Sequence, residues 1–459
     1  MYESREPHHE GGLSLLSRER DLTEQTVLAR KEWRRHWPLV LASSFAFSFT
    51  SVMAASIGTF IEPWTSEFGW SRTLVSSGMA IGAVTAFLFS PLFGLLIDRI
   101  GTRHLALPGL VLLAGAMASL SLLDGSVWLW FVIWTVYAGA ALATQPTVWT
   151  AGVASVFDAG RGLALALTLS GAALAQALGP PLANHLINDL GWRMALVWMA
   201  LGWGGPAFLL CLFLQHDGYD ASRRARAEDP QTASPDAKSL LSEEPGLSVA
   251  EAWRSVALWR IAISTFLMLV VTVALVVHQI PILIENGVDR TSAAYYAGMA
   301  GLAGVAGKLV TGWLLDRYPA RWVGGLTLSA TALSFVLLLL QNRSMPTIFV
   351  AMFINGYATG TKLQLAGFLT SAYGGMKNFG AIFGVIASLI AVGGGIGPLV
   401  GGVIYDSFGN YDPYLWFGFF ATLFCGFLIF GLPNYPEWVK RPHAKARIVR
   451  PRRPWRRAA

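Results

Sequence analysis

The chain has 459 residues, of which 54% are hydrophobic and only 13% are charged. A soluble domain carries roughly 25% charged residues, so this composition excludes a soluble enzyme. The net charge of +7 would suit a nucleic-acid-binding protein, but the basic residues are grouped by loop, which is typical of membrane topology. Both cysteines, Cys211 and Cys425, lie inside apolar runs, which excludes a disulfide framework or a cysteine-based zinc site.

Twelve apolar stretches follow one another along the chain, each long enough to cross a bilayer, for which a helix needs about 20 residues. In chain order they cover residues 38–60, 73–97, 104–123, 127–150, 162–187, 193–214, 258–284, 292–315, 322–341, 346–369, 380–404 and 413–432. They predict an all-α membrane protein with twelve transmembrane helices, grouped as two six-helix pseudo-repeats.

The polar segments between and around these stretches divide the chain into five parts. We expect an N-terminal tail at 1–37, a six-helix bundle at 38–214, a linker at 215–257, a second six-helix bundle at 258–432 and a basic C-terminal tail at 433–459. Within the linker, Val249, Trp253 and Val256 recur at helical spacing, which predicts an interfacial helix on the membrane surface.

The basic residues assign an orientation, because cytoplasmic loops carry an excess of lysine and arginine. Of the 34 basic residues, 28 fall on one side of the predicted membrane, together with both tails and the linker. We therefore expect a multi-pass protein of the cytoplasmic (plasma) membrane with both termini in the cytoplasm. Attraction to anionic lipid explains the basic C-terminal tail better than nucleic-acid binding does, so no nucleic-acid partner is expected.

The sequence repeats itself at an offset of 218 residues. Arg72 and Thr73 correspond to Arg290 and Thr291, Asp98 and Arg99 to Asp316 and Arg317, Gly179 and Pro180 to Gly397 and Pro398, and Gly191 to Gly409. Residues of such different types do not match at one offset by chance. The repeat predicts two bundles of the same orientation, with a substrate site near the membrane midplane between them.

Two lysines lie inside predicted membrane helices, where ionisable residues are costly and indicate function by default. Lys308 lies eight positions before Asp316, and Lys362 lies at a similar distance from the cytoplasmic end of its helix, about 12 Å into the membrane at 1.5 Å per residue. No Asp or Glu lies in the middle of a predicted helix, so an anionic substrate would relieve both cations. Lysine side chains that snorkel to the interface are the structural alternative.

Uncharged polar residues at mid-depth are further candidates for lining a substrate cavity, although hydrogen bonding between helices explains them equally well. They are Gln145, Gln176, Asn355 and Gln364. His278 lies near the end of its predicted helix, and we favour a hydrogen-bonded structural histidine there over a substrate or proton ligand. Several tryptophans near predicted helix ends are assigned to interfacial anchoring, namely Trp37, Trp64, Trp128, Trp192, Trp313 and Trp416.

The segment from Gly94 to Arg103, which contains Asp98-Arg99 and Gly101, resembles the loop motif of the major facilitator superfamily between helices two and three, and it recurs from Gly312 to Arg317. Within that superfamily the chain resembles the monocarboxylate transporters and the related oxalate/formate antiporters. The stretches that carry this resemblance are Phe68 to Arg72, Trp253 to Trp259 and Gly375 to Gly380.

The resemblance implies roles for both groups of charged residues. It assigns a cytoplasmic gating network to Asp98, Arg99, Arg103, Asp316 and Arg317. It also implies a carboxylate contact for Lys308, which stands where these families usually have an arginine, although lysine lacks the bidentate fork of arginine. Helix one has no lysine near Ala55, and Gly304 replaces an acid one turn before Lys308, so proton coupling by that route is not implied.

The sequence as a whole predicts a secondary active transporter of a small organic anion, similar to a monocarboxylate, that works by alternating access. We expect no enzyme and no cofactor, since the chain has neither a nucleotide-binding Gly-x-x-x-x-Gly-Lys loop nor a nucleophile constellation. The expected partners are the organic anion, the lipid bilayer and a coupling proton or counter-anion. Two alternatives stay open: an exporter of drugs or hydrophobic compounds on the same fold, and a non-transporting membrane sensor.

The orientation is tested by single cysteines placed at positions 124 and 230. The two positions are expected to react with a membrane-impermeant thiol reagent from opposite sides, because an odd number of predicted helices separates them. Reaction of both positions from the outside of intact cells would contradict the orientation assigned from the basic residues.

Overall fold

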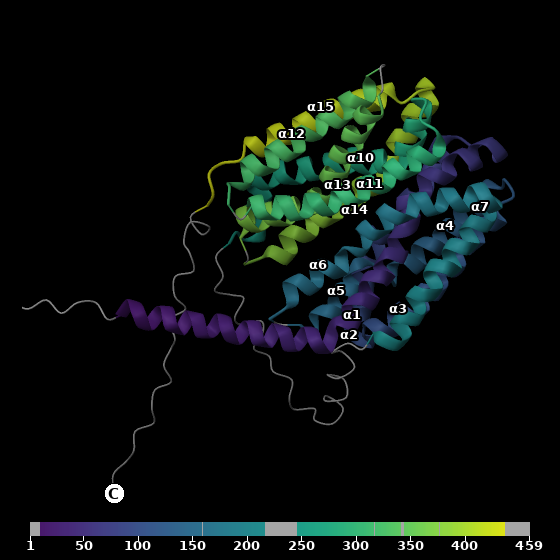
Figure 1. Ribbon diagram of the computed structural model, residues 1–459. Helices are drawn as coiled ribbons and strands as arrows, with labels where there is room; N and C mark the ends of the chain where they lie inside the picture. Colours follow the sequence, from purple (N-terminus) through teal and green to yellow (C-terminus); the bar gives the residue numbers. More distant parts are fainter. Residues whose placement is uncertain are drawn as a thin grey trace, which may run out of the picture.

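The computed structural model describes residues 10–157, 159–215, 246–315, 317–340, 344–375 and 377–436, without the side chains of 10–25, 91 and 98. Figure 1 shows two helical bundles side by side, one formed by α1 to α7 and the other by α10 to α15. The predicted all-α fold with two repeated halves is confirmed. Most of the linker and most of the basic C-terminal tail lie outside the described residues.

The first half contains α1 (Glu10–Phe68), α2 (Arg72–Ile100), α3 (Thr102–Ser119), the 3-10 helix η1 (Leu120–Leu122), α4 (Val127–Leu142), α5 (Pro146–Ala154), α6 (Arg161–Leu169) and α7 (Gly171–Leu214). The second half contains α10 (Val256–Glu285), α11 (Arg290–Leu315), α12 (Ala320–Leu339), α13 (Met345–Gly374), α14 (Phe379–Phe408) and α15 (Asp412–Phe430). The short helix α9 (Val249–Arg254) precedes the second half.

Every one of the expected spanning stretches is helical, although the helix boundaries differ from the prediction. The expected fourth helix is divided into α4 and α5 before Pro146, which starts α5, and the expected fifth begins as α6 and continues into α7. In the described part of the chain, ten helical segments are long and apolar enough to cross a membrane. This number treats 161–214 as one segment and leaves out α13, whose polar Asn355, Lys362 and Gln364 lower its hydropathy.

The first helix begins at Glu10, far before the apolar stretch that was expected to start at residue 38. Leu, Glu and Arg, which are frequent in this part of α1, are strong helix formers, so the helix continues through the polar N-terminal segment. Its first part projects beyond the bundle (Figure 1).

The internal repeat has the same backbone packing in both halves. Gly179 of α7 lies against Val52 of α1, and a Cβ added to it would be 3.7 Å from the Val52 carbonyl oxygen. Gly397 of α14 lies in the same way against the carbonyl oxygen of Val270, which is the repeat partner of Val52. The helical segment after Gly179 ends at Gly191, and the segment after Gly397 ends at its repeat partner Gly409. Both of these glycines have positive φ values, of 79° and 73°.

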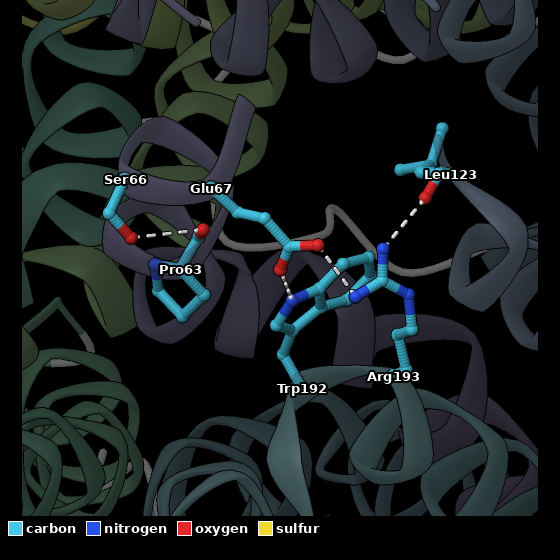
Figure 2. Close-up of polar contacts among 6 residues, drawn as sticks. All are labelled: Pro63, Ser66, Glu67, Leu123, Trp192 and Arg193. Carbon is cyan, nitrogen blue, oxygen red and sulfur yellow. Dashed lines mark hydrogen bonds and ion pairs between the residues drawn. The ribbon is translucent and has the colours of Figure 1, made fainter. Parts of the chain in front are cut away.

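The bend at Gly191 positions the two residues that fasten α7 to α1. Trp192 donates a 2.6 Å hydrogen bond from its indole nitrogen to Glu67, and Arg193 forms a 2.7 Å ion pair with the same carboxylate (Figure 2). Arg193 also donates to the carbonyl oxygen of Leu123, at the end of η1, at 3.1 Å. This cluster connects three segments of the first half.

The expected anchoring role of two tryptophans is wrong. Trp64 is fully buried and packs against Phe60, Trp130 and Trp192 with ring centroids 5.2–6.2 Å apart, and Trp192 is itself buried. Aromatic rings prefer such tilted and stacked contacts when they are brought together in a core. The remaining tryptophans of that set are about half exposed or more: Trp37, Trp128, Trp313 and Trp416.

The short helix α9 lies where an interfacial helix was expected. Ser248 and Glu251 form a capping box at its start, in which each side chain bonds to the backbone of the other residue. The backbone and side-chain hydrogen bonds from Ser248 hold the pKa of Glu251 below its usual value. Val249 and Trp253 are exposed. The contact of α9 with a membrane surface remains a prediction.

Helices α11 and α13 cross at backbone contact through glycines. A Cβ on Gly360 would overlap the carbonyl oxygen of Gly304, and a Cβ on Gly307 would be 2.5 Å from the carbonyl oxygen of Tyr357. Small residues permit this approach in membrane proteins, where close packing holds helices together without a hydrophobic driving force.

We expect Gly360→Ala to destabilise the protein, because the methyl group must displace the backbone of α11. Overpacking of this kind costs about 1–3 kcal/mol. Thermal unfolding in detergent measures the effect. The matched control is Gly367→Ala in the same helix, where a Cβ meets nothing closer than a Phe383 ring atom at 4.0 Å. Equal stability of the two variants would contradict the close crossing.

Candidate functional site

The two halves are joined at the end of the bundle opposite to the linker, where α2 begins and α14 ends. The carboxylate of Asp406 accepts hydrogen bonds from the backbone N–H groups of Arg72 and Thr73 at 3.1 and 2.9 Å, and from the Thr73 hydroxyl at 2.5 Å. The partial positive charge at a helix N-terminus favours this anion. The Arg72 guanidinium also lies 3.4 Å from the centroid of the Tyr405 ring. We call this contact the Asp406 latch.

Further hydrogen bonds join the halves near the same end. Arg290, the repeat partner of Arg72, donates to the carbonyl oxygen of Thr59 at 2.7 Å, and Asn184 donates to the Thr291 hydroxyl at 3.2 Å. The arginines at the start of α2 and α11 therefore both contact the opposite half.

His278 of α10 is fully buried at this junction. Its Nε2 is 2.9 Å from the carbonyl oxygen of Pro398 and 3.3 Å from the hydroxyl of Ser76 in the other half. Because a carbonyl oxygen only accepts, Nε2 carries a proton, and Nδ1 accepts from the Tyr411 hydroxyl at 2.8 Å when the ring is neutral. The preferred interpretation of His278 as a hydrogen-bonded structural residue agrees with these contacts.

Between the halves, closer to the centre of the molecule, lies a cavity of about 170 Å³ that we call the lysine chamber. It is lined by Ser51, Ala54, Ala55, Met79, Ala172, Gln176, Val273, Val276, Val277, Thr359 and Lys362. The first half supplies α1, α2 and α7 to this lining, and the second half supplies α10 and α13.

A second cavity of about 330 Å³, the aromatic chamber, shares Ala54, Met79 and Val273 with the first. Its other lining residues are Thr50, Met53, Gly78, Gly82, Ala83, Trp134, Tyr137, Ala138, Ala141, Ala391, Gly394 and Gly395. The shared residues make the two chambers neighbours in one central space between the halves.

Lys362 is the charged residue of the lysine chamber. Its side chain is 7% exposed, and the ammonium group donates a 2.7 Å hydrogen bond to the Thr272 hydroxyl. That hydroxyl donates in turn to the carbonyl oxygen of Met268 at 2.7 Å. No carboxylate of the described residues contacts Lys362. A buried cation without an anion is costly, which leaves a strong preference for an anionic ligand.

Two other polar groups of the same chamber have unused hydrogen-bonding capacity. The amide nitrogen of Gln176 and the hydroxyl of Thr359 are buried and have no hydrogen-bond partner among the described residues. Buried polar groups are nearly always hydrogen-bonded, so unpaired donors that line a cavity beside an ammonium group suit a ligand with acceptor atoms. Thr359 precedes Lys362 by three positions and therefore lies on the same face of α13.

The other predicted site residues lie elsewhere. Lys308 is half-buried on α11 and is not among the residues that line either chamber. Asn355 is fully buried, and its side-chain nitrogen and oxygen have no partner in the described structure. Gln145 accepts a 3.0 Å hydrogen bond from the Ser90 hydroxyl, and Gln364 is exposed. The structure thus brings Lys362 and Gln176 together and does not bring Lys308 to them.

The predicted gating residues are described only in part. Arg103 donates to the carbonyl oxygen of Leu212 at 2.7 Å, and Arg317 lies over the Trp313 ring at 4.3 Å. Arg99 lies in the last turn of α2. The Asp98 side chain and residue Asp316 are outside the described part, so the gating network stays a prediction.

Several residues of the site were not predicted from the sequence. Asp406, Thr272 and Thr359 were not singled out, because threonines are common in membrane helices and Asp406 lies at a helix end. The helical spacing of Thr359 and Lys362 is the signal by which Thr359 could have been found. Among the described residues, no group of three or more His, Cys, Asp or Glu could hold a metal ion.

Two repeated helical halves with a central cavity between them define the class of secondary transporters. The chain belongs to the Major Facilitator Superfamily, whose sequence model matches residues 40–306 and 274–459. It is accordingly a multi-pass membrane transporter and not an enzyme.

Among curated proteins, the chain is 27% identical to monocarboxylate transporter 13 of Bos taurus over 379 residues, which cover 82% of this chain and 84% of the relative. It is 27% identical to monocarboxylate transporter 12 of Rattus norvegicus over 312 residues, which cover 63% and 61% of the two chains.

Two solved structures share the fold. A D-xylose–proton symporter matches with a TM-score of 0.68 and 13% identity, over 88% of this chain and 99% of that chain. A bacterial homolog of the human lysosomal transporter Spinster, in an inward-facing and unoccupied conformation, matches with a TM-score of 0.61 and 17% identity, over 85% and 93% of the chains.

The Asp406 latch is expected to bias the equilibrium between two arrangements of the halves. Asp406→Ala removes three charge-assisted hydrogen bonds, each worth about 1.5–3 kcal/mol, so the population in which this end is open should rise at least tenfold. Spin labels at the exposed positions Asp124 and Phe408 measure the separation of the halves. Asp189→Asn is the matched control, because Asp189 pairs with His185 of its own helix. An unchanged distance distribution in Asp406→Ala would contradict the latch.

Proposed function

We propose that this transporter carries a small organic anion, similar to a monocarboxylate, across the cytoplasmic membrane by alternating access. The observation that carries the proposal is the buried ammonium group of Lys362, which lies in a cavity between the halves and has no carboxylate partner in the described structure. The names of the curated relatives, monocarboxylate transporters 12 and 13, support the same substrate class.

The chemistry of the lysine chamber suits a carboxylate. An ammonium group has three donors, and Lys362 uses one of them for Thr272. The remaining donors, together with those of Gln176 and Thr359, are enough for the four acceptor positions of a carboxylate. Binding would replace the lost hydration of both charges with charge-assisted hydrogen bonds.

Lys308 is the second lysine inside the predicted membrane helices. It is half-buried, and in the described part of the chain it has no hydrogen bond or ion pair. Because it lies outside the lysine chamber in this arrangement of the halves, we assign it to the route of the anion between the chamber and the linker end. Asn355, whose side chain also has no partner in the described structure, precedes Lys362 by seven positions on α13 and is a candidate for the route between the chamber and the outer end.

The basic residues orient the carrier with its linker end in the cytoplasm. In that orientation the Asp406 latch closes the outer end of this structure. Rocking of the two halves about the central cavity would open the outer end in turn, with a proton or counter-anion as the coupling species. Anionic lipid would contact the basic tails.

An exporter of hydrophobic compounds is the second candidate, because the aromatic chamber is lined mainly by apolar residues. Exporters of cationic drugs need an acidic group for the cation, however, and neither chamber has an acidic residue in its lining. The lysine in the neighbouring chamber favours anions instead.

Substitution of the lysines tests the proposal directly. We expect Lys362→Gln to weaken the binding of lactate, pyruvate and phenylacetate about ten- to a hundredfold, since one charge-assisted hydrogen bond is worth roughly 1.5–3 kcal/mol. Lys308→Gln and Lys308→Arg should leave these affinities nearly unchanged, because Lys308 lies outside the lysine chamber in this arrangement of the halves. Calorimetry on the purified variants measures these affinities, with helical content checked by circular dichroism.

The control for these variants is Lys377→Gln, which removes an exposed lysine between α13 and α14. It should bind all three acids like the unmodified protein. Unchanged affinity in Lys362→Gln would refute a carboxylate contact of this residue, and the organic-anion proposal would lose the observation that carries it.

A further inference from the structure

The central space has two parts of different chemistry. The lysine chamber, of about 170 Å³, holds the polar groups of Lys362, Gln176 and Thr359. The aromatic chamber is about twice as large, at about 330 Å³, and its lining contains no charged residue. A ligand with a charged head and an apolar body would match both parts at once.

Side chains and glycines shape the aromatic chamber together. Trp134 and Tyr137, one turn apart on α4, and the sulfur-containing Met53 and Met79 supply large apolar surfaces. The walls formed by α2 and α14 contain glycines, which leave space in the chamber. A Cβ on Gly82 of α2, or on Gly394 of α14, would meet no atom within 4 Å. These two glycines therefore border open space, one in each half.

The volume of the aromatic chamber is large for a short acid. Small-molecule sites usually occupy about 300–1,000 Å³, and the aromatic chamber alone reaches the lower limit of this range. The carboxylate of a two- or three-carbon acid would fit in the lysine chamber and leave the aromatic chamber without a partner. An apolar group in that chamber would instead gain the free energy of burial.

We propose that the substrate is an amphipathic monocarboxylate whose aromatic or similarly large apolar body occupies the aromatic chamber while its carboxylate contacts Lys362. This inference rests on the proposed organic-anion function and specifies its substrate class. A dicarboxylate of similar length is excluded as the preferred substrate, because its second charge would lie against Trp134 and Met79 without a cation.

The experiment compares propionate with 3-phenylpropionate, which differ only in the apolar body. Each buried methylene-sized group adds about fourfold to affinity, so the unmodified protein should bind 3-phenylpropionate at least about thirtyfold more tightly. Calorimetry on the full-length purified protein measures both affinities, and Lys362→Gln is measured alongside.

Two variants place a side chain in the aromatic chamber at positions where an added Cβ meets no atom within 4 Å. Gly82→Leu and Gly394→Leu should each weaken 3-phenylpropionate at least about tenfold and leave propionate within about twofold, because leucine occupies the space of the ring and not that of the carboxylate. Gly115→Leu on α3 is the control, since a Cβ there also meets nothing within 4 Å and Gly115 lines neither chamber. Thermal unfolding confirms that all variants are folded.

The outcomes separate the two proposals. If both acids bind equally, or if the leucine variants weaken both acids alike while Lys362→Gln still weakens binding, the inference about the apolar body is overturned and the organic-anion function stands. If neither acid binds, or if Lys362→Gln changes neither affinity, the organic-anion function fails and the inference fails with it. Selective loss of 3-phenylpropionate in both leucine variants supports the inference.

Discussion

An ammonium group buried between two halves, without an anion of the described chain beside it, is the interaction on which the central site depends. Removal of a charge from water costs several kcal/mol, and a single hydroxyl partner offsets only a part of that cost. The close glycine crossing of α11 and α13 fixes the helix that carries Lys362. The packing of the second half therefore holds the buried ammonium group in place, and the proposed preference for an anion rests on this arrangement.

Among the described residues, the side-chain hydrogen bonds between the halves lie at one end, and close glycine contacts, such as Gly58 against Val277 and Gly301 against Ala177, join the halves as well. Asp406, Arg290 and His278 each bond to backbone or side-chain atoms across or beside the junction. Hydrogen bonds need a narrow range of distances and angles, so they are lost when the halves rotate. Contacts between apolar surfaces tolerate small displacements. A junction of this kind suits the two separate states of the proposed alternating access.

Features that depend on composition or on a repeated pattern could be predicted from the sequence. The contacts of individual side chains could be predicted less well. The helical stretches and the position of Lys362 inside a membrane helix follow from hydropathy and charge alone, and the two halves follow from the repeat. The burial of Trp64 and Trp192 does not, because a tryptophan near a helix end faces lipid or core according to the rotation of the helix, which changes by about 100° per residue. The same reason separates Lys308 from the chamber of Lys362, although both lie at similar depth along their helices. The Asp406 latch joins residues 333 positions apart, and no local pattern predicts it.

The two halves share the same glycine-mediated helix packing, but their cavity-facing side chains differ in chemistry. Gly179 and Gly397 pack against equivalent residues of α1 and α10, but the first half contributes Trp134, Tyr137 and Gln176 to the central space and the second half contributes the ammonium group. A substrate that fills both chambers must therefore contact both halves. A ligand shifts a conformational equilibrium only by its difference in affinity for the two states. Residues of both halves line each chamber, so an acid with its carboxylate at Lys362 and its body in the aromatic chamber would stabilise the arrangements in which the halves approach each other around it. Binding of such a substrate would thereby be coupled to the movement of the halves.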